Sequence, residues 1–404
     1  MKEYLKTLLT HGLYVMHGRH LTRDYLAAHS SAVPECVIAI GKAAAAMAEG
    51  AYDMYGSSIK ATLIITRENH VPESLYAKPG CSIVIGDHPI PGARSLAAGQ
   101  CLLRFIAEQP AGRSLLCLIS GGASALVEVL RPGISITDLH HANHWLLASG
   151  LDIASVNAVR KSLSAIKAGG LARQLHAHEV NALLLSDVAG DDPAVIGSGL
   201  LVADSRVPEI LAGLDLPAWL AALSHKFIQA GDTLPVIPQI IGNNAMLVQA
   251  LAERARNDGY HVIANYNLLS GDAQTQGFAV AKQLVQMPPA LYIQGGETTV
   301  QLPANPGRGG RNTSLALAAA CELAGRNDCW LLAAGSDGSD GTTEYAGAIV
   351  NGETISAGKR SGMDAAQYLS HADSAGYLEP MDALVHTGPT GTNVMDVVVG
   401  MRQE

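Results

Sequence analysis

The sequence of 404 residues contains few aromatic and few charged residues. Aromatic residues make up 4% of the chain and charged residues 16%, whereas hydrophobic residues make up 48%. The formal net charge is −9 and no cluster of lysine or arginine stands out, which argues against a nucleic-acid partner. A chain that is rich in alanine, leucine, valine, isoleucine and glycine is typical of an α/β protein with buried parallel strands.

Long apolar runs and targeting signals are also missing from the sequence. No segment approaches the roughly 18 apolar residues that a membrane span requires. The N-terminus, MKEYLKTLLTHGLYVMHGRH, lacks the apolar core and cleavage site of a signal peptide. The six cysteines form no Cys-x-x-Cys pair, as expected for reduced thiols. We therefore expect a cytoplasmic protein with no membrane or nucleic-acid partner, and we allow for a homo-oligomer.

Three common catalytic signatures are absent. Gly41-Lys42 lacks the glycine and the hydroxyl residue of a P-loop, so a P-loop NTPase is excluded. No Gly-x-Gly-x-x-Gly follows an early strand, and GRGGRN at 307–312 does not fit it, which argues against a conventional dinucleotide-binding dehydrogenase. No Gly-x-Ser-x-Gly elbow occurs. His140, His141 and His144 share an expected helix, but no acid completes a zinc-like spacing.

Short apolar runs alternate with segments of helical period along most of the chain, which indicates βαβ units. The pattern breaks around 215–240, where GDTLPVIPQII indicates a linker, and GAIVNGETIS at 347–356 indicates a hairpin with Asn-Gly at its turn. We predict two Rossmann-like α/β domains, 1–235 and 236–404, with mostly parallel sheets and an interdomain cleft. The expected strands of the first domain are 35–40, 61–66, 81–86, 114–120 and 181–187.

Polar, glycine-rich loops follow the apolar strands in both halves, where α/β enzymes bind ligands. They are IGKA (40–43), GDHPIPG (86–92), SGGAS (120–124), SDVAGDD (186–192), QGGETT (294–299), PGRGGRN (306–312), AGSDGSDG (334–341) and HTGPTGTN (386–393). One such loop, SGGAS, has two readings: a tight strand-to-helix turn, or bare backbone that wraps an anion. The whole set, with its acids, lysine and arginines, favours a ligand site.

Taken together, these motifs resemble the class II glycerate kinases, the glycerate 2-kinase family with a C-terminal MOFRL-type domain, some members of which have been labelled hydroxypyruvate reductase. The matching stretches run in family order from about residue 36 to about residue 399 and include GKAAAAMAEGA, GDHPIPGARSLAAG, LISGGASAL, LLLSDVAGDDPAVIGSG, GGETTV, GRGGRNTSLAL, LLAAGSDGSDGTT and HTGPTGTNVMDV. The chain departs from the family pattern at Ala123, at Leu200-Leu201 and at Thr313-Ser314. These departures bear on the identity of the acceptor substrate.

The resemblance implies ATP-dependent phosphorylation of D-glycerate at its 2-hydroxyl, giving 2-phosphoglycerate and ADP, with ATP and Mg²⁺ as cofactors. Such a reaction needs cradled phosphates, a divalent metal and fixed cations. The implied roles are catalysis for Lys42 and Arg311, nucleotide binding for Ser120, Gly121, Gly122, Ser124, Asp187 and Asp191, substrate binding for His88 and Arg308, and metal binding for Glu297, Asp337 and Asn393. Asp340 could assist Asp337, and Asn157, Arg160 and Lys161 could face the cleft.

Three other functions are weighed against this one. The chain could phosphorylate a related small sugar acid, it could be an NAD(P)H-dependent hydroxypyruvate reductase, or it could be a non-catalytic sensor of a nucleotide or sugar acid. The missing dinucleotide motif argues against the reductase. A sensor would have no need of a lysine, an arginine and several acids in strand-end loops. Release of ADP with D-glycerate, compared with oxidation of NADH by hydroxypyruvate, separates these functions.

Overall fold

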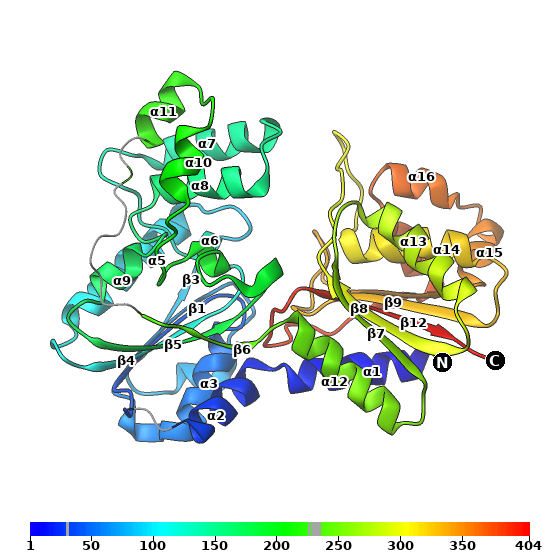
Figure 1. Cartoon of the computed structure of the whole chain (residues 1–404), viewed down its shortest axis with the longest axis horizontal. Coiled ribbons are helices and arrows are strands. Elements are labelled where there is room, and N and C mark those ends of the chain that lie inside the picture. The colour runs from blue at the N-terminus through cyan, green and yellow to red at the C-terminus, as the bar shows by residue number, and fades with distance from the viewer. Residues whose placement is uncertain (30–31, 225–226, 228–235) are drawn as a thin grey trace. The chain divides into compact units, whose positions relative to one another are not determined.

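A computed structural model of the chain describes residues 1–29, 32–224, 227 and 236–404 (Figure 1). The chain divides into two compact units. The first unit is Gly18–Ile241, and the second unit combines Met1–His17 with Gly242–Glu404. The expected boundary at 235/236 places residues 1–17 in the N-terminal domain, whereas the structure groups them with the second unit.

Helix α1 (Lys2–Val15) joins the second unit by packing against α12 (Asn244–Asn257). The close approach depends on Gly12, because a Cβ there would lie 2.6 Å from Leu251 Cδ2. An amphipathic helix at the start of a chain shows which residues it buries, but not which distant surface it buries them against.

The first unit is built on a six-stranded sheet with the order β3-β2-β1-β4-β5-β6. Neighbouring strands from β3 through β5 are parallel. Its strands are β1 (Cys36–Ile40), β2 (Ala61–Thr66), β3 (Cys81–Ile85), β4 (Ser114–Ile119), β5 (Glu179–Leu185) and β6 (Gln239–Gly242). This is the strand order of a doubly wound fold, whose switch point lies between β1 and β4. The continuous apolar runs of β1 and β4 follow from burial on both faces of the sheet.

Helices cover both faces of the first sheet (Figure 1). The alanine-rich α3 packs with β1, β2 and β4 on one face, and α5 packs with β2 and β3 on the other. The helices of this unit are α2 (Gly18–Ala28), α3 (Ala44–Tyr55), α4 (Glu73–Tyr76), α5 (Ala93–Glu108), α6 (Ala123–Leu126), α7 (Ile136–Ala148), α8 (Ile153–Leu163), α9 (Gly170–Gln174), α10 (Val207–Ala212) and α11 (Ala218–Ser224).

The second unit contains a mixed six-stranded sheet with the order β11-β10-β9-β12-β8-β7. The C-terminal strand β12 inserts antiparallel between β9 and β8, whereas β7 and β8 are parallel. Its strands are β7 (Val262–Leu269), β8 (Ala290–Gly296), β9 (Cys329–Gly335), β10 (Gly347–Asn351), β11 (Leu384–Val385) and β12 (Asp396–Arg402). The predicted fold class, two α/β domains, is confirmed, with an all-parallel core in the first sheet and mixed pairing in the second.

Helices α13 and α14 cover one face of the second sheet, and α1 and α12 lie on the other (Figure 1). The remaining helices are α13 (Ala273–Gln286), α14 (Arg311–Leu323), α15 (Thr354–Arg360), α16 (Ala365–Ser370) and α17 (Ser374–Leu378). Within the described ranges, none of the helices has the length and apolar character needed to cross a membrane. All six cysteines are free thiols.

One local prediction is wrong, and a second falls partly outside the described residues. The segment 347–356 is not a hairpin, because β10 ends at Asn351 and α15 begins at Thr354. Gly352 serves close packing instead of a hairpin turn, since a Cβ there would lie 2.1 Å from the carbonyl oxygen of Arg326. The expected linker at 215–240 contains α11, and its residues 225–226 and 228–235 lie outside the described residues.

Candidate active site

The loops after β1 and β4 lie side by side at the switch point of the first sheet. Ile40 and Ile119 are register partners at the ends of these strands. The backbone N–H of Ser120 donates to Ile40 O at 3.0 Å, and that of Lys42 donates to Gly121 O at 2.9 Å. The two loops that the sequence singled out, IGKA and SGGAS, are therefore joined by main-chain hydrogen bonds.

The Ser120 hydroxyl holds the Lys42 loop in place. Its Oγ accepts the backbone N–H of Ala43 at 3.0 Å, and the residue is completely buried. Gly41 completes this contact, because a Cβ at φ +132° would lie 2.2 Å from Ser120 Oγ. We expected this hydroxyl to face the nucleotide phosphates; the structure instead engages it inside the protein, where it positions the loop that carries Lys42.

Gly122 lies at the meeting point of two predicted site residues. It adopts φ +83°, and a Cβ there would lie 3.1 Å from Lys42 Cγ and 3.4 Å from His88 Nε2. Lys42, His88 and Gly122 follow β1, β3 and β4, so the carboxyl ends of three strands bring them together. Gly122 therefore makes the tight turn of the SGGAS loop and leaves room for the side chains of Lys42 and His88.

The segment after this loop is a short helix. Helix α6 contains four residues, Ala123–Leu126. So short a helix carries little of the macrodipole that we expected at its N-terminus. The Ser124 hydroxyl lies 2.7 Å from that of Ser198, and this contact ties the SGGAS loop to the segment that follows β5.

Asp187 and Asp191 occupy that segment, at the same sheet edge, because β5 pairs with β4. Both are half-buried, and Asp191 has a left-handed backbone with φ +52°. The segment is held by the buried Lys161 and by a more exposed ion pair between Arg206 and Asp192. Lys161 Nζ donates to Ala194 O at 2.9 Å and to Asp204 Oδ2 at 2.6 Å, and Arg206 Nη2 reaches Asp192 Oδ2 at 2.8 Å.

Two cations that we considered for a cleft or for an exposed helix face have structural contacts instead. The Lys161 side chain is only 3% exposed and pairs with Asp204. Arg160 Nε donates to Asn143 Oδ1 at 2.9 Å, and burial lowers the pKa of Arg160. These contacts hold the helix in place, and neither group is presented to a ligand by them.

In the second unit, Arg311 forms ion pairs with two acidic residues. It is the first residue of α14, and its Nε and Nη2 donate to the two oxygens of Asp396 at 2.5 and 3.0 Å. Its Nη1 lies 2.6 Å from Glu297 Oε1. Burial alone would lower the pKa of Arg311, but the charges of Asp396, Glu297 and Asp337 raise it. The guanidinium is thus permanently charged and fixed in orientation.

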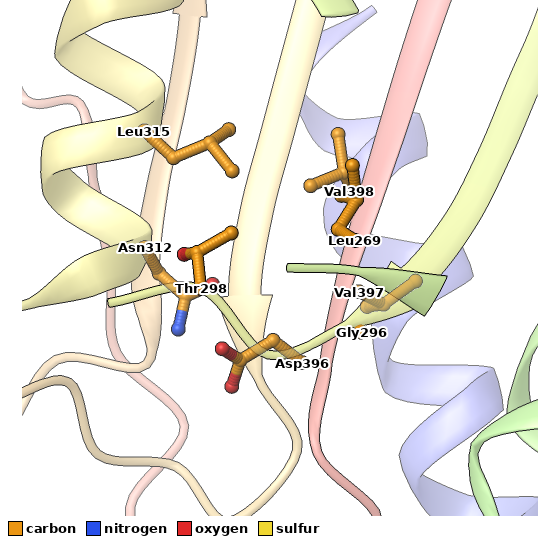
Figure 2. Close-up of a pocket in the computed structure, with 8 residues that line it drawn as sticks. All are labelled: Leu269, Gly296, Thr298, Asn312, Leu315, Asp396, Val397 and Val398. Atoms are coloured by element: carbon orange, nitrogen blue, oxygen red, sulfur yellow. The ribbon is translucent and has the colours of Figure 1, made fainter. Parts of the chain in front are cut away.

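Asp396, which begins the central strand β12, is the partner of Arg311 that the sequence analysis did not single out. Its side chain is 8% exposed. It lines a cavity of about 10 Å³, and Figure 2 shows its carboxylate on the side of Asn312 and Thr298. That volume is sufficient for about one water molecule. An acid at the start of an otherwise apolar strand, DVVVGM, was the signal that could have identified it, because a buried carboxylate needs a partner.

The carboxylates of Asp337 and Asp396 both lie beside Gly335, the last residue of β9. A Cβ on Gly335 would lie 3.4 Å from Asp337 Oδ1 and 3.3 Å from Asp396 Oδ1. Asp337 Oδ1 accepts the N–H and the hydroxyl of Ser339 at 2.9 and 3.1 Å. Asn393, three residues before Asp396, is buried in the loop that leads into β12.

Asp340 caps helix α14. Its oxygens accept the backbone N–H groups of Asn312 and Thr313 at 2.9 and 2.8 Å, and the Thr313 hydroxyl at 2.7 Å. Burial raises the pKa of Asp340, and the hydrogen bonds from Thr313 and Asn312 oppose that shift. The assisting role that we considered for Asp340 does not fit this arrangement, because its oxygens hold the helix that presents Arg311.

Arg308 is placed apart from the acids that hold Arg311. Its Nη2 donates to Glu379 Oε2 at 2.9 Å, and its backbone N–H donates to Asp373 Oδ1 at 2.9 Å. Both charged side chains of the Arg308–Glu379 pair are about half-exposed. These contacts anchor the PGRGGRN loop.

The three residues that we expected to bind metal carry oxygen donors of the kind that suit a hard cation. Glu297, Asp337 and Asn393 offer carboxylate and amide oxygens from the ends of β8, β9 and the loop before β12. Among the described residues, no group of three His, Cys, Asp or Glu side chains is arranged as a protein-only metal site. Mg²⁺ usually takes one or two carboxylates and completes its shell with phosphate oxygens and water. The residues present therefore fit a magnesium ion that binds together with a nucleotide.

The fold and the two clusters define a two-domain α/β enzyme, and the comparisons with known proteins give its family. Residues 4–218 match the model described as a domain of unknown function, DUF4147, and residues 290–396 match the MOFRL family. D-glycerate 2-kinase of Thermotoga maritima is 34% identical over 90% of each chain. A putative hydroxypyruvate reductase of Agrobacterium vitis is 35% identical over 89% of this chain and 85% of that one.

A solved structure gives the same result. The crystal structure of glycerate kinase from Thermotoga maritima matches with a TM-score of 0.85 and 31% identity, covering 99% of this chain and all of that one. The chain belongs to the glycerate kinase family that combines a DUF4147 domain with a MOFRL domain. The predicted family resemblance is confirmed.

Proposed function

We propose that the protein transfers the γ-phosphoryl group of ATP to the 2-hydroxyl of D-glycerate, giving 2-phosphoglycerate and ADP. The observation that carries this proposal is the convergence of Lys42, His88 and Gly122 at the switch point of a doubly wound sheet. The name of the Thermotoga relative, D-glycerate 2-kinase, supports the choice of acceptor and of hydroxyl.

The first unit would bind the phosphates. Gly121 and Gly122 present main chain with no side chain in the way, and backbone N–H groups in such a turn suit phosphate oxygens. Lys42 emerges from a loop that main-chain hydrogen bonds and the Ser120 hydroxyl hold rigid. A lysine in this position neutralises charge on the transferring phosphoryl group. His88, beside it, would contact the hydroxy acid.

The second unit would supply the metal ligands and the second cation. Glu297, Asp337 and Asn393 would hold Mg²⁺, which screens the charge of the nucleotide phosphates when it is bound. Arg311 is fixed by Asp396 on one edge, so its orientation costs no reorganisation when charge develops nearby. A planar guanidinium suits a phosphoryl group or the substrate carboxylate.

The test is formation of ADP from ATP and Mg²⁺ with a panel of small hydroxy acids. We expect turnover with D-glycerate, and phosphorus NMR should show the phosphate on the 2-hydroxyl. The panel should include four-carbon aldonates, because the departures at Leu200-Leu201 and Thr313-Ser314 could change the acceptor. Absence of ADP formation with every acid would overturn the proposal.

The reductase is kept as a second candidate because a relative at 35% identity is named a putative hydroxypyruvate reductase. It predicts oxidation of NADH or NADPH by hydroxypyruvate without ATP. The turn after β1, IGKA, lacks the glycine pattern that binds a dinucleotide pyrophosphate. We expect no NADH or NADPH consumption above the rate without enzyme.

We also propose that the protein acts in the cytoplasm on a small-molecule substrate. The six free thiols support a reducing compartment, because secreted proteins usually pair their cysteines. Cell fractionation of the source organism, with detection of the untagged protein, tests this location.

A further inference from the structure

A left-handed residue leads into the strand that carries Asp396. Met395 has φ +65°, a left-handed conformation that is costly for a side chain such as that of methionine. It separates Asn393, a proposed magnesium ligand, from Asp396, the partner of Arg311. The bend at 394–396 therefore decides how these two groups are presented.

Two buried side chains satisfy the main chain of this bend. Asn244 Nδ2 donates to Val394 O at 2.8 Å and to Asp396 O at 2.9 Å, which lie on either side of Met395. The Ser336 N–H donates to Met395 O at 3.0 Å, and Ser336 Oγ accepts the Val394 N–H at 2.7 Å. A strained left-handed residue is maintained when several hydrogen bonds from its surroundings hold it, as they do here.

Asn244 also touches the end of β8. It is the first residue of α12 and is 1% exposed. A Cβ on Gly295 would lie 1.7 Å from Asn244 Oδ1, so only glycine allows the amide to sit there. Gly295 lies two residues before Glu297, and Ser336 lies directly before Asp337. One amide and one hydroxyl thus connect the three strand ends that carry the acids around Arg311.

The position of Asn244 is not explained by the needs of its helix. Asn243, the preceding residue, already caps α12 by accepting the Met246 N–H at 3.0 Å. A buried amide is expensive unless its hydrogen bonds are required, and an apolar side chain would fill the same space. Both amide hydrogens of Asn244 are instead donated to main-chain oxygens of the bend next to Asp396.

We propose that Asn244, together with Ser336, is a positioning residue that fixes Asp396 and the acids beside it, and through them Arg311 and the bound magnesium. The proposal rests on the proposed kinase function. Neither side chain is assigned a contact with substrate. Partners that orient metal ligands and their neighbours typically contribute about 10- to 100-fold in metal affinity or activity.

The test uses Asn244→Ala and Ser336→Ala, with Val280→Ala as the control. Val280 is a buried residue of α13 in the core of the same unit, so its truncation lowers stability without touching the bend. We expect both test variants to lose about 10- to 100-fold in kcat at saturating ATP and in affinity for Mn²⁺ measured with the nucleotide. Val280→Ala should keep the wild-type kcat and Mn²⁺ affinity even where its melting temperature falls as far as that of the test variants, or further.

A second readout does not depend on turnover. Hydrogen–deuterium exchange of peptides covering 390–397 should accelerate in Asn244→Ala and Ser336→Ala but not in Val280→Ala. Gly295→Ala, which displaces the Asn244 amide, should reproduce the loss in kcat. Added to Asn244→Ala, it should cause no further loss, because its effect passes through an amide that is already gone. If Asn244→Ala does not fold, Ser336→Ala and Gly295→Ala carry the test.

The outcomes separate the two claims. A wild-type protein that forms no ADP with any hydroxy acid overturns the kinase function. Hydrogen–deuterium exchange at 390–397 then still shows whether Asn244 and Ser336 hold the bend in place. An active wild type with kcat and Mn²⁺ affinity kept within about threefold in the variants overturns the positioning role. The positioning role is also overturned if the test variants lose no more kcat and Mn²⁺ affinity than Val280→Ala does at the same melting temperature. That result would mean that Asn244 and Ser336 have a purely structural role.

Discussion

The buried ion pair between Lys161 and Asp204 should make a measurable contribution to the pH dependence of the first unit's stability. The two side chains are 3% and 7% exposed, and their charged atoms lie 2.6 Å apart. Burial alone would raise the pKa of Asp204, but hydrogen bonds from Arg206 and Lys161 lower it to about 2. An aspartate in an unfolded chain has a pKa of about 3.9, so the folded state binds this proton more weakly.

A difference of about two pKa units corresponds to about 2.5 kcal/mol of stability. Because the pKa is lowered on folding, this contribution is present above about pH 4 and is lost as the pH falls from about 4 toward 2. Asp204→Asn imitates the protonated carboxyl group. It should lower the free energy of unfolding of the first unit by about 2.5 kcal/mol at neutral pH, and by up to about 5 kcal/mol because Lys161 stays buried without its counter-charge. Lys161→Met in addition should recover part of the loss.

Tryptophan fluorescence can follow the first unit separately. Trp145 and Trp219 belong to it, and Trp330 belongs to the second unit. Urea unfolding in a Trp330→Phe background therefore reports the free energy of the first unit. The gap between the background protein and Asp204→Asn should stay constant from neutral pH to about pH 5 and narrow below about pH 4. A loss under about 1 kcal/mol at neutral pH, or a gap that does not narrow in acid, would refute the reasoning.

Three predictions concern the proposed reaction and share the ADP-release assay. Lys42→Ala should lower kcat by about 10²- to 10³-fold with an unchanged melting temperature, by analogy with the loss of one oxyanion donor, and a near-normal kcat would remove Lys42 from the mechanism. Arg311→Lys should recover little of the activity lost in Arg311→Ala, because one ammonium cannot span both oxygens of Asp396; full recovery would show that charge alone is needed. Gly122→Ala should raise KM for ATP about tenfold and lower stability by about 1–2 kcal/mol, since its Cβ would press on Lys42 at a left-handed φ. Loss of stability with a normal KM for ATP would mean that the glycine serves only the turn.

The sequence by itself determined the strands of the first sheet and the loops that follow them. The runs CVIAI and SLLCLI indicate buried strands, because burial on both faces of a sheet selects continuous apolar residues. A lysine and a pair of glycines directly after those runs had to lie at one edge of a parallel sheet. The sequence therefore placed Lys42 and Gly122 in one set of strand-end loops, and the pairing of β1 with β4 in the structure makes them neighbours.

Only the tertiary structure decided which distant groups meet. Local pattern does not show that β12 enters the second sheet antiparallel, and without that pairing Asp396 has no reason to face Arg311, 85 positions away in the sequence. Two further hydrogen bonds join segments that are remote in sequence. One connects the Ser120 hydroxyl to the Ala43 N–H, and the other connects the Asn244 amide to the bend at Met395. Secondary structure follows from nearby residues, whereas the partner of a buried polar group is fixed by packing of the whole unit, because only packing determines which donor and acceptor are left without water.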